Sequence, residues 1–292
     1  MLDILYKYFN WSDLGSRKIL TEQEIYFCNA KKWKNYGEFD FTFKDINPES
    51  LRKEIKYNVE RMQWENPKQH EKWFNVHLHK YKIDFSKYST LQPVEKDLYE
   101  AEVQEKIIDR RVGDIINNPE IYERNTRTFY FTRTGIFSTS LSKESSQLWG
   151  WKQNYNGTKN GNAICIGLDF DKLKTILDTV GNYTLGSVNY QGKQNEVDFI
   201  GTGNTFLINR LNSITYTLPE DAVENIEEQQ EVRILKFLTN DTSDKSTERF
   251  LKLKYDCIKE IIIHSNTSND TQDEIRQIAK VIGCANLEYS KL

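Results

Sequence analysis

The chain has 292 residues, and its 40 Lys and Arg residues against 43 Asp and Glu residues give a formal net charge of −3. A charge so close to zero argues against a dedicated nucleic-acid-binding protein, because the affinity of such proteins depends on a positive surface. Apolar residues make up only 38% of the chain, but its 15 Phe, 6 Trp and 16 Tyr residues can each bury a large area. A folded chain is therefore predicted, and a disordered one is excluded.

The sequence has no apolar run long enough to cross a membrane, which takes about 18 residues or more. Its first eight residues lack the basic and apolar regions of a secretion signal. We therefore expect a cytoplasmic protein with no membrane partner. The four cysteines are far apart and without CxxC spacing, so we expect them to be reduced. They are Cys28, Cys165, Cys257 and Cys284.

Strand and helix patterns alternate at the start of the chain. Residues 4–8 and 24–28 are rich in aromatic and branched apolar residues, which is typical of strands. Residues 12–20 between them predict a helix.

A long helical segment is expected next. Asn47-Pro48 begins a helix whose apolar residues recur at helical spacing, and a second long helix follows Pro93. We predict that residues 48–125 form a helical insertion or cap within one α+β domain spanning residues 1–292.

Beyond residue 125 the pattern changes to short strands that alternate with helices. The expected strands are residues 128–137, 163–168, 183–190, 231–238, 249–254 and 260–264. The expected helices are residues 171–180, 204–216 and 271–282. Together with the opening strands, this pattern predicts an α+β fold built on a sheet of six to eight strands.

The first candidate site follows an acidic segment. Residues 219–231 contain six carboxylates and no Lys or Arg, and they lead directly into a predicted strand. Residues two apart on a strand share one face, so Gln229, Glu231 and Arg233 are predicted to project together. The plain structural alternative is an exposed ion pair between Glu231 and Arg233.

Three further segments are candidates for binding. Residues 137–142 (Phe-Ser-Thr-Ser-Leu-Ser) end a predicted strand with small hydroxyls, which brace ligands or, more commonly, make turns and caps. Residues 6–8 (Tyr-Lys-Tyr) place a cation between two rings, suited to a phosphate and a flat heterocycle or to a half-exposed edge strand. Trp149 belongs to an aromatic cluster for which core packing is the alternative.

Taken in order, these segments resemble a large bacterial family known only as domain of unknown function 2971. The resemblance spans nearly the whole chain through short motifs that agree in order and spacing. The matching residues are Leu5-Tyr6-Lys7-Tyr8, Ile19-Leu20, Ile25-Tyr26-Phe27, Ser140-Leu141-Ser142, Leu148-Trp149, residues 164–168 and residues 229–233. Trp151 stands where the family has a His, and Gln229 replaces the first acid of a closing Glu-x-Glu-x-Arg motif. Glu231 is thereby left as the candidate catalytic carboxylate.

The layout also resembles that of an ADP-ribosyltransferase, with a basic or aromatic group on the first strand, a central Ser-Thr-Ser strand and a late Gln-x-Glu or Glu-x-Glu. This resemblance implies a split mixed or antiparallel sheet with flanking helices, NAD as the substrate and no metal. Glu231 would stabilise the positive ribose of an oxocarbenium-like transition state. Gln229 would orient the acceptor.

The same resemblance implies a set of cofactor-binding residues. They are Tyr6, Lys7, Tyr8, Ser138, Ser140, Trp149 and Arg233. In this set the two serines would brace Glu231 and the ribose, and a tyrosine would stack on the nicotinamide. Lys7 or Arg233 would meet the diphosphate.

The sequence thus predicts a cytoplasmic toxin or phage-defence effector that transfers ADP-ribose from NAD to a protein or nucleic-acid acceptor. A cognate antitoxin or defence-system partner would accompany such an effector. The alternatives are a non-catalytic nucleotide- or protein-binding module and a metal-dependent nuclease using Glu228 and Glu231. His77-x-His79 would face one side of a strand, but no third metal ligand follows at a standard spacing.

Overall fold

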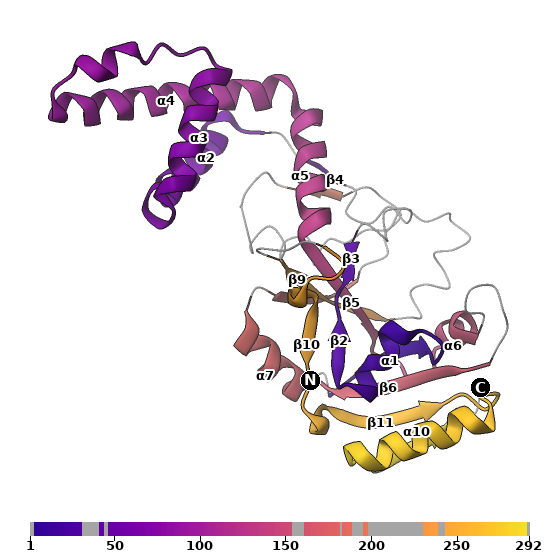
Figure 1. The fold of residues 1–292 in the computed structure, drawn as a ribbon. Coiled ribbons are helices and arrows are strands. Elements are labelled where there is room, and N and C mark those ends of the chain that lie inside the picture. Colours follow the sequence, from indigo (N-terminus) through magenta and orange to yellow (C-terminus); the bar gives the residue numbers. More distant parts are fainter. Residues whose placement is uncertain are drawn as a thin grey trace. The chain divides into compact units, whose positions relative to one another are not determined.

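The structure is a computed structural model, and it describes residues 3–30, 41–43, 46–153, 161–181, 183–188, 195–197, 230–238 and 243–290. The chain divides into two compact units. One comprises residues 1–40, 128–195 and 207–292, and the other comprises residues 41–127 and 196–206. The described residues contain eight α-helices and a mostly antiparallel sheet of eight strands, so the predicted α+β class is confirmed (Figure 1).

The first unit is built on the eight-stranded sheet, in which β12-β11-β6-β1-β5-β9-β7 follow one another and β3 also pairs with β5. All neighbours are antiparallel except β11 and β12, which are parallel. The strands are β1 (Ile4–Asn10), β3 (Cys28–Asn29), β5 (Thr134–Ser140), β6 (Ala163–Asp169), β7 (Tyr183–Ser187), β9 (Glu231–Phe237), β11 (Ile258–Ile263) and β12 (Asn286–Tyr289).

The main hydrophobic core lies on one face of this sheet. Buried apolar residues of α1 (Leu14–Thr21), α7 (Phe170–Val180) and α10 (Asn269–Ile282) pack there against the central strands. All seven residues of β6 are buried, as expected for a central strand covered on both sides. On the other face, α6 (Ser146–Gln153) places Trp149 against Tyr6 and Tyr8 of β1.

Smaller elements complete the described structure. β2 (Glu24–Tyr26) pairs with β10 (Phe250–Lys252), and β4 (Phe41–Phe43) pairs with β8 (Asn195–Val197). Three short 3₁₀ helices span Ser86–Thr90, Thr247–Arg249 and Tyr255–Cys257. No helix of the described ranges is both long and apolar enough to span a membrane.

The second unit is helical. It contains α2 (Pro48–Glu65), α3 (Pro67–Lys80), α4 (Pro93–Asn117) and the start of α5 (Pro119–Arg133). Each of these helices begins with proline, whose fixed φ suits the first helical position. Leu51, Ile55 and Val59 of α2 pack against apolar residues of α4 that follow the same helical spacing.

Several predicted boundaries need correction. The strand predicted for residues 128–137 is wrong at its start, because α5 continues to Arg133 and β5 occupies Thr134–Ser140. The aromatic residues of this stretch favour strands, but the helix begun at Pro119 overrides that preference. The strand expected at residues 24–28 is divided between β2 and β3. The helix predicted for residues 204–216 lies outside the described residues.

Candidate functional site

The edge of β5 is open between two points of pairing. β5 pairs with β1 through a single residue pair, Ser140 with Tyr6, and with β3 at Ile136 and Gly135. Gly135 permits the second approach, because a Cβ there would lie 2.6 Å from the Cβ of Phe27. In the described part of the chain, no strand pairs with this edge at residues 137–139. We call this interruption of the pairing between β1 and β5 the split.

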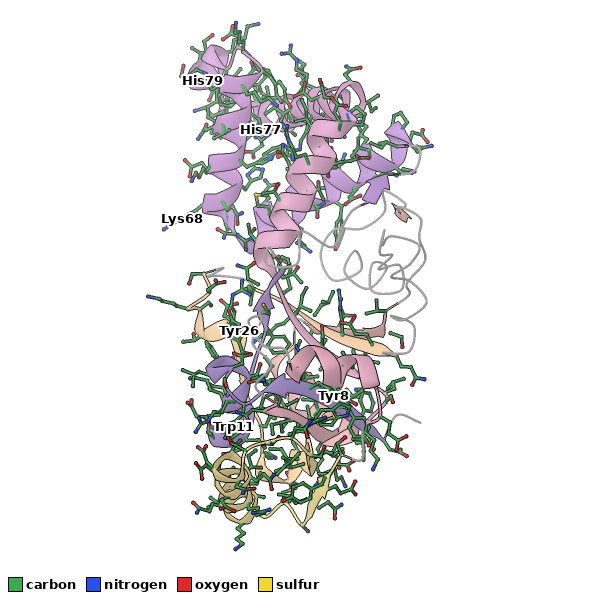
Figure 2. All side chains as sticks on the ribbon, turned by 90° about the vertical axis from the view of Figure 1, so that its right-hand side faces the viewer. Tyr8, Trp11, Tyr26, Lys68, His77 and His79 are labelled. Atoms are coloured by element: carbon green, nitrogen blue, oxygen red, sulfur yellow. The ribbon has the colours of Figure 1, made fainter. Side chains whose placement is uncertain are left out.

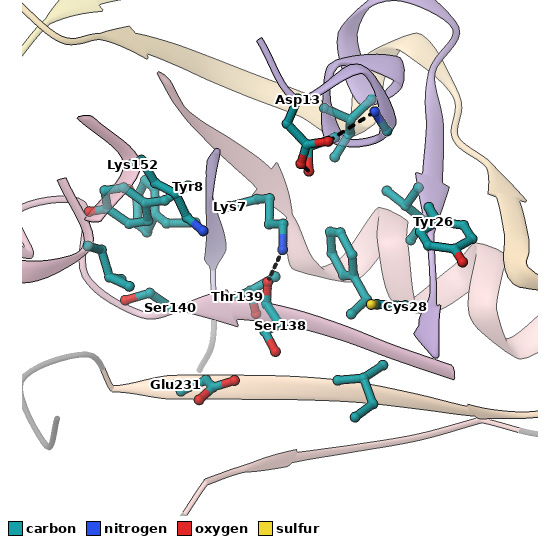
Figure 3. A pocket seen from close by; sticks show the side chains of 18 of the residues that line it. Lys7, Tyr8, Asp13, Tyr26, Cys28, Ser138, Thr139, Ser140, Lys152 and Glu231 are labelled. Atoms are coloured by element: carbon teal, nitrogen blue, oxygen red, sulfur yellow. Dashed lines mark hydrogen bonds between the residues drawn. The ribbon is translucent and has the colours of Figure 1, made fainter. Parts of the chain in front are cut away.

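A cavity of about 520 Å³ lies at this split (Figure 3). Its walls come from β1, α1, β2, β3, β5, α6 and the first residue of β9, so both faces of the sheet contribute. The charged residues that line it are Lys7, Asp13, Glu24, Lys152 and Glu231. The volume falls in the range of roughly 300–1,000 Å³ that is typical of small-molecule sites.

The strand register aligns a row of residues on the α6 face of the sheet. Glu260 of β11 lies opposite Gly167 of β6, which lies opposite Tyr6 of β1. Tyr6 in turn lies opposite Ser140 of β5, and Ser140 lies opposite Glu231 of β9. Directly paired residues of antiparallel strands project from the same face. Strand pairing thus brings together Tyr6, Ser140 and Glu231, which are far apart in the sequence.

Glu231 lines the cavity, and Arg233 holds its carboxylate. Nε of Arg233 donates a hydrogen bond to Oε1 of Glu231 at 2.6 Å, and Nη2 donates to Oε2 at 3.1 Å. The two residues are 8% and 1% exposed, so this is a buried, bidentate ion pair and not an exposed one. The pair fixes the orientation of the carboxylate and offsets part of its charge. Arg233 itself is not among the residues that line the cavity.

The residue before Glu231 interrupts the strand pattern. β9 begins at Glu231, and Gln230 has a φ of +43°, in the left-handed region that few residues other than glycine adopt. The regular strand geometry that relates Glu231 to Arg233 begins at Glu231. Gln229 lies outside the described residues, and its role towards the acceptor stays a prediction.

The two candidate serines differ in what their hydroxyls contact. Ser140 Oγ donates to the carbonyl of Ser142 at 3.1 Å and accepts from its backbone N–H at 2.9 Å, which stabilises the turn after β5. Ser138 Oγ is buried and has no hydrogen-bond partner among the described residues. A buried hydroxyl without a partner costs free energy. A ligand that bonds to Ser138 would offset this cost, so Ser138 is the stronger candidate for a functional role.

The aromatic residues expected to bind the nicotinamide are packed into the α6 face. Tyr6 Oη donates to Glu260 Oε1 at 2.8 Å, and Tyr8 Oη donates to the carbonyl of Ser142 at 2.8 Å. Burial raises the pKa of both phenols. Trp149 is 1% exposed and contacts Tyr8 edge-on, with 5.1 Å between the ring centroids. Trp149 therefore belongs to the core and not to the cavity wall.

Lys7 and Lys152 bring two amino groups to the cavity (Figure 3). Lys7 Nζ donates to the carbonyl of Ser138 at 2.9 Å, at the open edge of β5, and lies 4.9 Å from the centre of the Phe137 ring. Burial, together with the nearby charge of Lys152, lowers the pKa of Lys7 to about 8. Burial also lowers the pKa of Lys152.

No family profile, curated protein or solved structure matches the chain. The chemistry of the site therefore follows from its own residues. These provide a fixed carboxylate at one wall, two amino groups and the hydroxyl of Ser138. Such a combination suits a ligand that carries both a sugar and an anionic group.

The paired histidines belong to the helical unit. His77 and His79 are on α3 (Figure 2), so the strand predicted there is wrong. Residues two apart on a helix point in different directions, so the two rings do not share a face. His77 Nδ1 contacts the carbonyl of Trp73 at 2.7 Å, and its Nε2 accepts from Arg111 at 3.0 Å. Within the described ranges, no group of three His, Cys, Asp or Glu side chains is arranged to hold a metal ion.

Two residues of the site region were missed in the sequence. Lys152 follows an aromatic cluster and belongs to no motif, so nothing in the sequence marks it. Glu260 interrupts an apolar strand, and a charge in such a run is a signal of a buried polar contact. Gly167 makes that contact to Tyr6 feasible, because a Cβ at this position would lie 2.7 Å from Glu260 Cγ.

Proposed function

We propose that the protein is an NAD-dependent ADP-ribosyltransferase-like enzyme that transfers ADP-ribose to a macromolecular acceptor. The observation that carries the proposal is the cavity at the split of the sheet, with the carboxylate of Glu231 in its wall. The split itself supports the ADP-ribosyltransferase-like version of the α+β fold. Membership of the bacterial family of unknown function 2971, a cytoplasmic toxin or defence role and a cognate partner belong to the same proposal.

The chemistry requires an ionised carboxylate at the sugar. Breaking the bond between nicotinamide and ribose leaves positive charge on the sugar, as in glycoside hydrolysis. A carboxylate placed beside the ribose stabilises this charge more in the transition state than in the ground state. In our proposal Glu231 provides that carboxylate, and Arg233 is a positioning residue that keeps it ionised and correctly turned.

Other residues take roles that fit their surroundings. Lys7 meets the diphosphate of NAD, since its amino group lies at the cavity and carries no contact to a carboxylate among the described residues. Ser138 braces the ribose, and Gln229 orients the acceptor. Tyr6 and Tyr8 form the wall behind the site and do not stack on the nicotinamide, because their rings are packed against α6.

The test measures nicotinamide release and NAD content. Wild type and Glu231→Gln are compared with purified protein and labelled NAD, and in cells by growth and NAD content. Glu288→Gln is the matched control, because Glu288 has an exposed side chain on β12, away from the cavity. We expect Glu231→Gln to lower turnover by about 10²–10³ and to relieve any growth defect, while Glu288→Gln behaves as wild type.

The proposal fails if folded wild type and Glu231→Gln release nicotinamide at the same rate and leave the same NAD content in cells. Circular dichroism and thermal melting check that Glu231→Gln is folded. The glutamine keeps the size of the side chain and an oxygen that accepts from Arg233.

One observation favours a second function: the positive charge of Arg233 is paired directly with the carboxylate of Glu231. A carboxylate that is already paired suits a non-catalytic nucleotide-binding module. In that case NAD would bind and no nicotinamide would be released by any variant. The nuclease alternative depends on Glu228, which lies outside the described residues, and it stays a prediction.

A further inference from the structure

The carboxylates that line the cavity all have partners of their own. Asp13 caps α1, accepting from the backbone N–H of Gly15 at 3.2 Å and from the hydroxyl of Ser16 at 2.6 Å. Glu231 is paired with Arg233. Glu24 lies 3.9 Å from Lys18 and 3.8 Å from Lys252, two lysines outside the cavity wall. The carboxylates of the cavity wall are therefore paired or hydrogen-bonded with groups other than Lys7 and Lys152.

The two cavity lysines are not compensated in this way. Among the described residues, Lys7 donates only to the carbonyl of Ser138, a neutral acceptor. In the part of the chain that the structure describes, the amino group of Lys152 has no hydrogen-bond or ion-pair partner, although Asp13 attracts it from a greater distance. Both amino groups face the same cavity, one from β1 and the other from α6.

Holding two like charges together in a half-buried cavity costs free energy. The lowered pKa values of Lys7 and Lys152 express this cost, since burial acts on both and their mutual repulsion acts on Lys7. A ligand with two negative charges would replace the hydration that the two amino groups have lost, and it would offset their mutual repulsion. The backbone N–H of Gly15, in the first turn of α1, is not available to such a ligand, because it already donates to Asp13.

We infer that Lys7 and Lys152 form a subsite for a dianionic phosphate group, and that Lys152 is a specificity residue of the cavity. The nucleoside diphosphate is the form of this group that suits a cavity of about 520 Å³. Assigning it to the diphosphate of NAD rests on the proposed function. The preference for a dianion does not, because it follows from the two lysines alone.

Calorimetric titration with ADP, inorganic diphosphate and adenosine tests the subsite. The variants are Lys152→Met, Lys152→Arg and, as the matched control, Lys172→Met, whose lysine lies on the surface of α7 beside Asp256. We expect Lys152→Met to weaken binding of ADP at least about tenfold, the value of a charge-assisted hydrogen bond. Lys152→Arg should restore most of the affinity, and Lys172→Met should bind as wild type.

The ligands separate the two sources of phosphate. Binding of ADP but not of inorganic diphosphate supports a nucleotide subsite, and binding of both supports a general diphosphate subsite. Adenosine should bind equally to wild type and Lys152→Met. The inference is overturned if neither anion binds to wild type, or if Lys152→Met binds both with unchanged affinity.

The same titration separates this inference from the proposed enzyme. Glu231→Gln should bind ADP at least as tightly as wild type, because it removes a negative charge near Lys7, while losing nicotinamide release. If wild type releases no nicotinamide but ADP affinity still depends on Lys152, the subsite stands and the enzyme does not. Thermal melting verifies that Lys152→Met folds, and removal of a half-buried, unpaired charge should leave its melting temperature equal or higher.

Discussion

Charged side chains are arranged in opposite ways in the helical unit and in the cavity of the sheet unit. On α2 and α4, Arg52 and Lys56 both pair with Glu105, and all three side chains are at least a third exposed. In the cavity, Lys7 and Lys152 are half-buried, and no carboxylate of the described residues pairs with them. These charges of the helical unit are thus hydrated and paired, while the two cavity lysines stay unpaired among the described residues at a cost in folding free energy.

This difference shows where the fold gives up stability. Exposed ion pairs contribute little, and their loss is easily tolerated. Buried charge is expensive, and where no local partner removes it, binding of a ligand is the physical reason for keeping it. Substitutions at or beside the cavity should therefore differ in effect from matched substitutions elsewhere in the chain.

The largest difference is expected between two arginine substitutions. Arg233→Met leaves the carboxylate of Glu231 buried without its bidentate partner, which should lower the free energy of unfolding by about 3–5 kcal/mol. Arg52→Met removes an exposed network and should cost about 1 kcal/mol or less. Urea denaturation followed by circular dichroism measures both. Glu231→Gln/Arg233→Met should recover much of the loss, and equal effects of Arg233→Met and Arg52→Met would contradict the contrast.

A smaller, pH-dependent difference is expected for two lysines. Folding lowers the pKa of Lys7 from 10.5 to about 8, so between these pH values the unfolded chain binds more protons and stability rises with pH. The stability of Lys7→Met relative to wild type should therefore be highest below about pH 8 and decrease towards pH 10.

Lys80→Met is the opposite control for this series. Asp114 raises the pKa of Lys80, so the contribution of Lys80 to stability is fully present below its unfolded pKa. The difference between Lys80→Met and wild type should stay flat from pH 7 to pH 10. Melting temperatures of both variants and of wild type across this range test the two expectations. Each kcal/mol of unfolding free energy should shift the melting temperature by about 2–4 °C in a unit of this size. Parallel curves for the two lysines would refute the prediction.

The smallest expected effect separates two buried hydroxyls on β5. Ser138 and Thr134 each have an Oγ with no hydrogen-bond partner among the described residues, but only Ser138 lines the cavity. Ser138→Ala and Thr134→Val should both change the free energy of unfolding by less than about 1 kcal/mol. Only Ser138→Ala should weaken NAD binding or turnover, by about two- to tenfold, the value of one neutral hydrogen bond. Identical kinetics of the two variants would remove Ser138 from the site.

Local sequence signals predicted much of the fold. Asn47-Pro48 and Pro93 marked helix starts that the structure contains, and the apolar residues at helical spacing form the core of the helical unit. Local sequence signals were misleading where the surrounding structure determines the secondary structure. The aromatic residues before Thr134 favour a strand in isolation, but they continue a helix begun at Pro119.

The site was only partly accessible to sequence reasoning. Glu231 and Arg233 share a face because strand geometry requires it, and this was predictable. That their side chains are buried, that Tyr6 faces Ser140 and that Lys152 reaches the same cavity depend on strand register and on α6, which no local pattern encodes.

The single residue pair between Tyr6 and Ser140 has a mechanical consequence. Among the described residues it is the one strand-paired position between β1 and β5, so twisting of β12-β11-β6-β1 against the remaining strands meets less resistance here than along the fully paired β1–β6 or β5–β9 borders. A ligand in the cavity would contact both groups of strands and resist this twisting. Its affinity is thereby tied to the stiffness of the whole sheet and not only to the side chains that it meets.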